Sequence, residues 1–189
     1  MTIDSPDLPR GQTPLPPLTT PEQPSLGFSI RVPPDWRRIE QVRECVVSAV
    51  EAVYAPVLVG DTTGIVVAEL LENAIKYGST RPCHVAIEGD RRQIRVAVTN
   101  HLDPMTSNPE TLGNHVDWIQ SFEEPQEAYM ACLTMAFQRS GTRPSGSGLG
   151  LARIRYEGGC TLAIDVQTPG RLTVLATQAL EWDAPLAGA

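Results

Sequence analysis

Apolar and polar residues alternate in five short runs of this chain, and between the runs apolar residues recur at helical spacing. The alternation predicts strands over 28–32, 83–88, 93–99, 161–166 and 172–177. The helical spacing predicts helices over about 36–54, 61–77, 109–122, 125–138 and 149–156. Helices therefore stand between groups of neighbouring strands, an order that is typical of α+β proteins.

Several residues mark the expected ends of these elements. Asp35 is suited to cap the first helix, and any of residues 61–63 to cap the second, which should end at Gly78. Turns at 89–92 and 168–170 are expected to close two hairpins. The prediction is a two-layer α+β sandwich, with a mixed, mainly antiparallel sheet and helices on one of its faces.

The two ends of the chain differ in composition from its middle. Residues 1–26 hold seven prolines among polar residues, which predicts a disordered tail that is more simply a solvated extension than a docking segment. Residues 181–189 are expected to be a frayed end. Residues 27–180 are enough for one compact domain with a single core.

The formal net charge of −7 narrows the range of partners. It leaves no broad basic surface for nucleic acid or an anionic membrane, so a protein partner is favoured. No apolar run has the length of a membrane span, and the chain is predicted to be cytoplasmic. Four scattered cysteines indicate buried thiols rather than a zinc site or a disulfide framework.

Candidate chemistry begins with Glu69, Asn73 and Lys76, which share one helix face at i, i+4 and i+7. A carboxylate can take a proton, an amide oxygen can ligate Mg²⁺, and an ammonium can meet phosphate charge. Taken alone, the pattern is more often an ordinary solvated helix face.

A glycine-rich turn that leads into the last predicted helix is the second motif. It consists of Gly146, Ser147, Gly148, Leu149 and Gly150. Free N–H groups at such a turn can cradle a phosphate, so the two motifs together predict an ATP site.

The order and separation of these motifs resemble the N box and the second glycine box of the GHKL ATPases. The resemblance covers about 27–178 and implies a Bergerat fold that binds ATP and Mg²⁺. It implies Glu69 as general base, Asn73 as the Mg²⁺ ligand, and Lys76 and the glycine turn as phosphate contacts. Arg143 and Arg153 flank that turn, and the favoured interpretation of each is a surface charge, with a phosphate contact as the alternative.

Two segments depart from the GHKL pattern. Asn100 stands where the family has an adenine-binding aspartate; its side-chain oxygen is still an acceptor, but the two glycines that usually follow are absent. The segment 106–143 replaces a short lid by two predicted helices, whose methionine and aromatic residues are more often core than partner surface. A helical insert of this kind is similar to that of SiaB-type bacterial kinases.

The resemblance to anti-sigma-factor serine kinases and SiaB-type partner-switching kinases implies a serine/threonine kinase. Its substrate would be a small antagonist protein, its second partner a sigma factor or another effector, and a homodimer is an open alternative to a monomer. The competing hypothesis is a catalytically silent GHKL module that regulates by binding a protein. Glu69, Asn73 and the glycine turn favour the kinase, whereas the altered loop at 100–104 favours the silent module.

Overall fold

The computed structural model describes residues 25–54, 59–103, 108–140, 148–167 and 170–181, and of residues 139 and 140 it describes the backbone alone. Within these ranges five strands and five helices alternate in groups. In chain order they are β1 (Leu26–Val32), α1 (Arg37–Tyr54), α2 (Gly60–Tyr77), β2 (Cys83–Gly89), β3 (Gln93–His101), α3 (Pro109–Gln120), α4 (Pro125–Ser140), α5 (Leu149–Tyr156), β4 (Cys160–Gln167) and β5 (Arg171–Ala179).

The strands form one sheet in the order β1-β2-β3-β5-β4, and each of the four pairings is antiparallel. The hairpin predicted at 89–92 is present, with the Asp90 N–H donating to the Gln93 carbonyl at 3.0 Å. The Asp90 carboxylate also accepts from the Arg92 and Gln93 N–H groups, which stabilises this turn.

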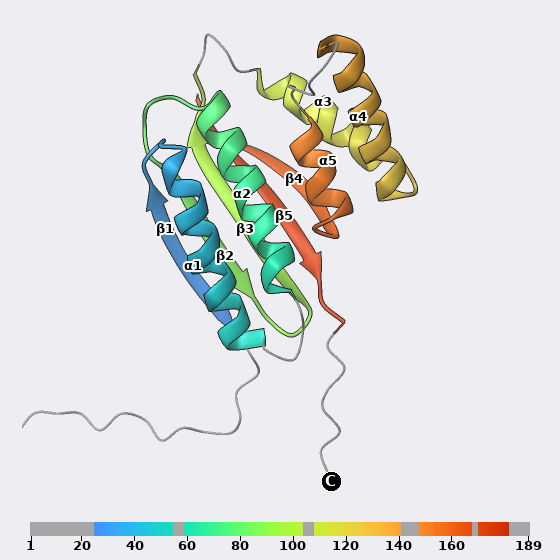
Figure 1. Cartoon of the computed structure of the whole chain (residues 1–189). Coiled ribbons are helices and arrows are strands. Elements are labelled where there is room, and N and C mark those ends of the chain that lie inside the picture. Colours follow the sequence, from blue (N-terminus) through green and yellow to red (C-terminus); the bar gives the residue numbers. More distant parts are fainter. Residues whose placement is uncertain (1–24, 55–58, 104–107, 141–147, 168–169, 182–189) are drawn as a thin grey trace, which may run out of the picture.

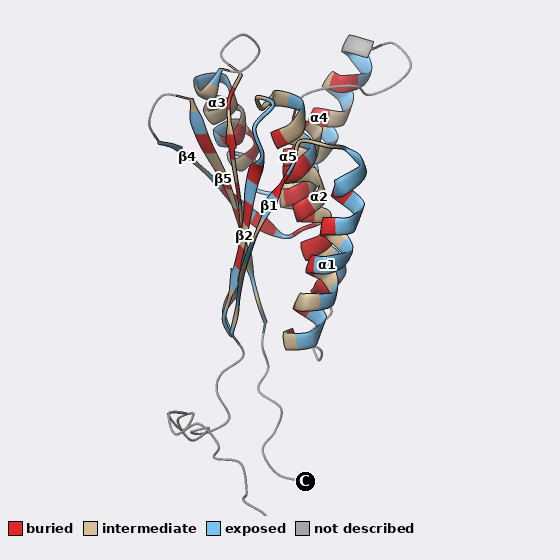
Figure 2. Cartoon of the chain, turned by 90° about the vertical axis from the view of Figure 1, so that its left-hand side faces the viewer, coloured by how far each residue is buried: buried red, intermediate tan, exposed pale blue. Residues whose placement is uncertain are grey.

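Helices α1 and α2 pack on one face of the sheet, while α3, α4 and α5 gather at one end of it (Figure 1). The strands β2, β3 and β5 bury alternate residues along most of their length, and the buried residues collect between the sheet and the helices (Figure 2). This confirms the predicted two-layer α+β fold with helices on one face of the sheet.

Helix α1 buries one apolar stripe at helical spacing, formed by Ile39, Val42, Val46, Val50 and Tyr54, and Val53 packs against the same core while partly exposed. The Asp35 carboxylate accepts a hydrogen bond from the Arg37 N–H at 3.0 Å, in agreement with its predicted role as a cap.

Helix α2 begins differently from the prediction. Its N-cap is Val59, without a side-chain hydrogen bond, so the prediction of a cap at 61–63 was wrong. The Thr62 and Thr63 hydroxyls instead donate to the Val59 carbonyl, a local bond that competes with capping. The helix does end before Gly78, as predicted.

Both helices predicted between 106 and 143 are present as α3 and α4. Asn108 caps α3 by accepting hydrogen bonds from the Glu110 and Thr111 N–H groups. At the other end of α3, the Arg155 guanidinium donates to the Ile119 and Phe122 carbonyls at 2.6 Å each. The inserted helices are therefore fastened to α5.

The methionine and aromatic residues of this insert divide between the core and the solvent-exposed surface. Trp118, Tyr129 and Met135 pack against the core, as predicted, whereas Met130 and Phe137 are about half exposed.

The four cysteines are free thiols. Three of them are buried, as predicted, but Cys45 is exposed, contrary to the prediction. None of the helices that the structure describes is both long and apolar enough to cross a membrane.

Candidate functional site

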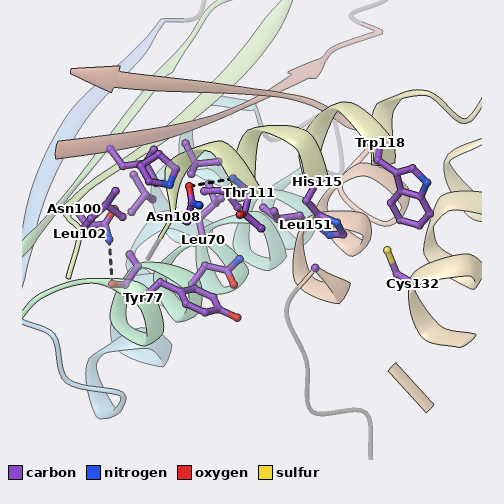
Figure 3. Close-up of a pocket in the computed structure, with 18 of the residues that line it drawn as sticks. Leu70, Tyr77, Asn100, Leu102, Asn108, Thr111, His115, Trp118, Cys132 and Leu151 are labelled. Atoms are coloured by element: carbon purple, nitrogen blue, oxygen red, sulfur yellow. Dashed lines mark hydrogen bonds between the residues drawn. The ribbon is translucent and has the colours of Figure 1, made fainter. Parts of the chain in front are cut away.

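A cavity of about 560 Å³ lies between α2, the central strands and the inserted helices. In Figure 3, Asn100 and Tyr77 lie at one end of the view and Trp118 and Cys132 at the other, with His115 between them. The walls of the cavity are mostly apolar and include Leu70, Leu102, Leu112, Leu151, Leu172 and Val174. A concave apolar cavity of this size, with a few polar groups, is typical of a small-molecule site.

The polar lining residues are uncharged or weakly basic. They are Asn73, Tyr77, Asn100, Asn108, Thr111 and His115. No lysine, arginine, aspartate or glutamate is among the described lining residues. The cavity thus suits a flat aromatic ring, and charged parts of a ligand would lie at its rim.

Asn100 is 6% exposed and lines the cavity at the end of β3. Its amide nitrogen donates to the Ala74 carbonyl at 3.3 Å, a bond drawn in Figure 3. This bond commits the nitrogen to α2 and leaves the oxygen as the acceptor for a ligand. The close approach requires Gly78, because a Cβ there would collide with the Ala74 carbonyl and lie 2.9 Å from the Asn100 nitrogen.

Asn73 also lines the cavity, one turn before Tyr77 on α2. Its amide nitrogen is buried and has no hydrogen-bond partner among the described residues. Such a group costs about 1–3 kcal/mol when left unsatisfied, so native proteins keep few of them and often at functional sites.

Glu69 lies one turn before Asn73, and its carboxylate is paired across to α5. Arg153 donates to it at 3.0 Å and to Glu157 at 2.8 Å. The Glu69 side chain is 16% exposed and that of Arg153 is 42% exposed. The hydrogen bond that Arg153 donates to Glu157, and to a lesser degree the one that it donates to Glu69, raise the pKa of the guanidinium.

Lys76 lies apart from this ion pair. Its side chain is exposed, its ammonium nitrogen lies 5.1 Å from the centre of the Tyr77 ring, and it is not among the lining residues. The predicted trio of Glu69, Asn73 and Lys76 lies along one face of α2, but the Lys76 ammonium and the Glu69 carboxylate do not converge on one point.

The glycine turn is described from Gly148 onward, and Gly146 and Ser147 lie outside the described residues. Gly148 has φ +106°, and a Cβ there would collide with the His115 ring. Helix α5 begins at Leu149, which is partly buried against the core. A Cβ on Gly150 would lie 2.5 Å from Glu69 Oε2 and 3.5 Å from Asn73 Nδ2. The backbone of this turn therefore reaches the two predicted site residues of α2.

Sequence reasoning missed His115 as part of the site. His115 stacks on Trp118, with ring centres 5.7 Å apart, and lines the cavity beside Gly148. Its role depends on how α3 packs against α5, which no local pattern in the sequence signals.

The residues present fit a bound Mg²⁺–nucleotide. Asn73 offers a buried, unpartnered amide, and rotation of the amide turns its oxygen toward a cation. Among the described residues, no three or more His, Cys, Asp or Glu side chains converge as a metal site. Magnesium at phosphate sites usually keeps several waters and takes phosphate oxygens, so a protein site for it needs to supply only one or two oxygen ligands.

Comparison with known proteins gives one informative likeness. No protein-family profile and no curated protein sequence matches this chain. Among solved structures, the chain is similar to a chain in the crystal structure of the SiaB–SiaC complex from Pseudomonas aeruginosa, with 19% identity and a TM-score of 0.59. The match covers 82% of this chain and 90% of that chain. At this level of identity the likeness shows a shared fold.

Proposed function

We propose that this chain is an ATP-binding serine/threonine protein kinase of a partner-switching pathway, which phosphorylates a small antagonist protein. The observation that carries the proposal is the buried, unpartnered amide nitrogen of Asn73, beside the glycine turn and on the wall of a cavity. The fold shared with a chain of a two-protein complex supports it.

Each residue then has a role that follows from its position. The Asn100 oxygen would accept from the adenine amino group inside the cavity, Asn73 would hold Mg²⁺, and the α5 N-terminus would face the phosphates. When bound, Mg²⁺ would partly neutralise the charge of the phosphates. Lys76 is retained as a phosphate contact at the rim.

Glu69 would act as the general base. It would take the proton of a partner's serine or threonine hydroxyl as that oxygen bonds to the γ-phosphorus, and the bond from the γ-phosphorus to the bridging oxygen breaks to leave ADP. The cavity holds the nucleotide, so the hydroxyl must come from a protein docked at its rim.

A second candidate is the catalytically silent GHKL module. One observation favours it: the Glu69 carboxylate, the proposed general base, is already paired with Arg153. In this case the same cavity and its rim would serve only to bind a protein partner.

Phosphoryl transfer to a captured protein distinguishes the two candidates. The purified chain would be used as bait, and any captured protein would be incubated with Mg·ATP and examined by mass spectrometry for phosphoserine or phosphothreonine. The kinase proposal predicts that wild type phosphorylates the captured protein and that Glu69→Gln captures it without phosphorylating it. Capture by wild type with no phosphorylation in Mg·ATP would contradict the kinase and favour the silent module.

A further inference from the structure

Arg153 is a basic side chain that α5 places directly against the proposed catalytic carboxylate. Its Nη1 lies 3.0 Å from Glu69 Oε1 and its Nε lies 2.8 Å from Glu157 Oε2. The guanidinium carries five N–H donors in a planar fork, and these two bonds leave part of the fork for a further acceptor.

The position of Arg153 corresponds to the phosphate end of the proposed site. Gly150 approaches both Glu69 and Asn73, and Arg153 follows Gly150 by three residues on the same helix face. The α5 N-terminus, the Mg²⁺ ligand and the Arg153 guanidinium therefore lie around one place at the rim of the cavity.

A triphosphate at this place needs a cation from the protein. The described lining of the cavity contains no lysine or arginine. Lys76 is seven residues from Glu69, about 10 Å along the helix, and its ammonium lies over Tyr77. A terminal phosphate beside the Glu69 carboxylate would be repelled by it, and among the described residues Arg153 is the cation in contact with that carboxylate.

We propose that Arg153 is the receptor for the terminal phosphate of ATP and exchanges Glu69 for this phosphate when ATP binds. The inference rests on the proposed ATP site, and it explains how that site would bind ATP in preference to ADP. An ion pair with a 42% exposed arginine is weak because water competes for it, whereas a guanidinium matches phosphate oxygens with two parallel hydrogen bonds. When ADP binds, the ion pair between Arg153 and Glu69 stays intact. When ATP binds, its terminal phosphate replaces Glu69 as the partner of Arg153, and the Glu69 carboxylate becomes free.

Calorimetric titrations of the full chain with Mg·ATP and Mg·ADP test this exchange. We expect wild type to bind ATP more tightly than ADP. Arg153→Ala should lower the ATP affinity about tenfold or more while changing the ADP affinity by less than about twofold, and Arg153→Lys should recover part of the loss. Arg95→Ala is the matched control, because Arg95 makes a comparable 2.8 Å ion pair with Glu88 on the opposite face of the sheet.

Glu69→Gln gives a result that a merely structural role of Arg153 would not produce. Removing the competing carboxylate charge should raise the ATP affinity about threefold or more. The double variant with Arg153→Ala should bind ATP about tenfold more weakly than Glu69→Gln alone, because Arg153 contacts the phosphate itself; equal affinities would mean that Arg153 only offsets the Glu69 charge. Equal losses for ATP and ADP in Arg153→Ala, or an unchanged ratio of the two affinities, would overturn the role of Arg153 while the ATP site stands. If wild type bound neither nucleotide, the ATP site would itself be wrong.

Discussion

Gly150 faces Glu69 so closely that a Cβ on the glycine would lie 2.5 Å from the carboxylate oxygen Oε2. The two residues belong to helices α5 and α2, which are far apart in the sequence. The absence of a side chain at position 150 therefore allows the glycine turn to reach the carboxylate and the amide of Asn73. This contact joins the two motifs into one site.

Gly150→Ala should push the Glu69 carboxylate away from the glycine turn and from its pair with Arg153. Because the displaced atoms are the end of a flexible side chain, we expect a loss of folding free energy of about 1 kcal/mol or less, whereas the affinity for Mg·ATP should fall several-fold because the new methyl group occupies the space between the turn and the α2 residues. Chemical denaturation and calorimetry measure the two effects. Gly113→Ala is the control: a Cβ there meets nothing within 4 Å in α3, so it should stabilise the fold by about 0.5–1 kcal/mol.

Asn100→Asp introduces the residue that GHKL proteins usually have at this position, yet we expect it to destabilise this chain. The amide nitrogen that donates to the Ala74 carbonyl would become a carboxylate oxygen facing another oxygen, at a cost of about 1–3 kcal/mol. The buried carboxyl would have a raised pKa in the folded state, so the loss should be smallest at acidic pH and grow as pH rises through its titration.

Urea denaturation at several pH values measures this effect. Asn108→Asp is the matched control, because an aspartate at the N-cap of α3 keeps the capping bonds and favours the helix dipole. Equal stability of Asn100→Asp and wild type at neutral pH would show that the Asn100–Ala74 bond does not hold β3 to α2.

The fastening of α3 by Arg155 can be tested separately from nucleotide binding. Arg155→Ala removes two hydrogen bonds to carbonyls at the end of α3 and should cost about 1–3 kcal/mol of unfolding free energy. Arg38→Ala should change stability by less than about 0.5 kcal/mol, since the exposed Arg38 side chain donates a hydrogen bond to Gln41 of the same helix and no described residue buries it. Similar denaturation midpoints for both variants would mean that Arg155 does not fasten the insert.

Thiol alkylation should follow the burial of the cysteines. Cys45 is exposed and should react first with iodoacetamide, as read by peptide mass mapping. Burial raises the pKa of the Cys160 thiol to about 12 and also raises those of Cys83 and Cys132, so these three should react slowly. Because Cys132 lines the cavity, Mg·ATP should slow its reaction further. Modification of Cys160 as fast as Cys45 would contradict the described core.

Each amphipathic helix or strand could be predicted because its own apolar residues recur at helical or strand spacing. The α1 stripe and the alternation of β3 depend on local spacing, and both are present at nearly the predicted bounds. The start of α2 could not be predicted from capping preference, since Thr62 and Thr63 turn their hydroxyls back to the Val59 carbonyl.

The site was harder to predict because it depends on tertiary packing. Helical spacing places Glu69 and Lys76 on one face, but they lie two turns apart, and α5 packs only at the Glu69 end. The partner of Glu69 is Arg153, which is 84 residues away in the chain. His115 enters the cavity only because α3 packs beside Gly148.

The most direct test of the account is a calorimetric titration of the purified full chain with Mg·ATP and Mg·GTP, comparing wild type, Asn73→Ala and the control Asn114→Ala. We predict micromolar binding of ATP by wild type and by Asn114→Ala, which changes an exposed asparagine of α3, and no measurable binding by Asn73→Ala. GTP should bind far more weakly, because its carbonyl would face the Asn100 oxygen. Undiminished ATP affinity in Asn73→Ala would contradict the site assignment.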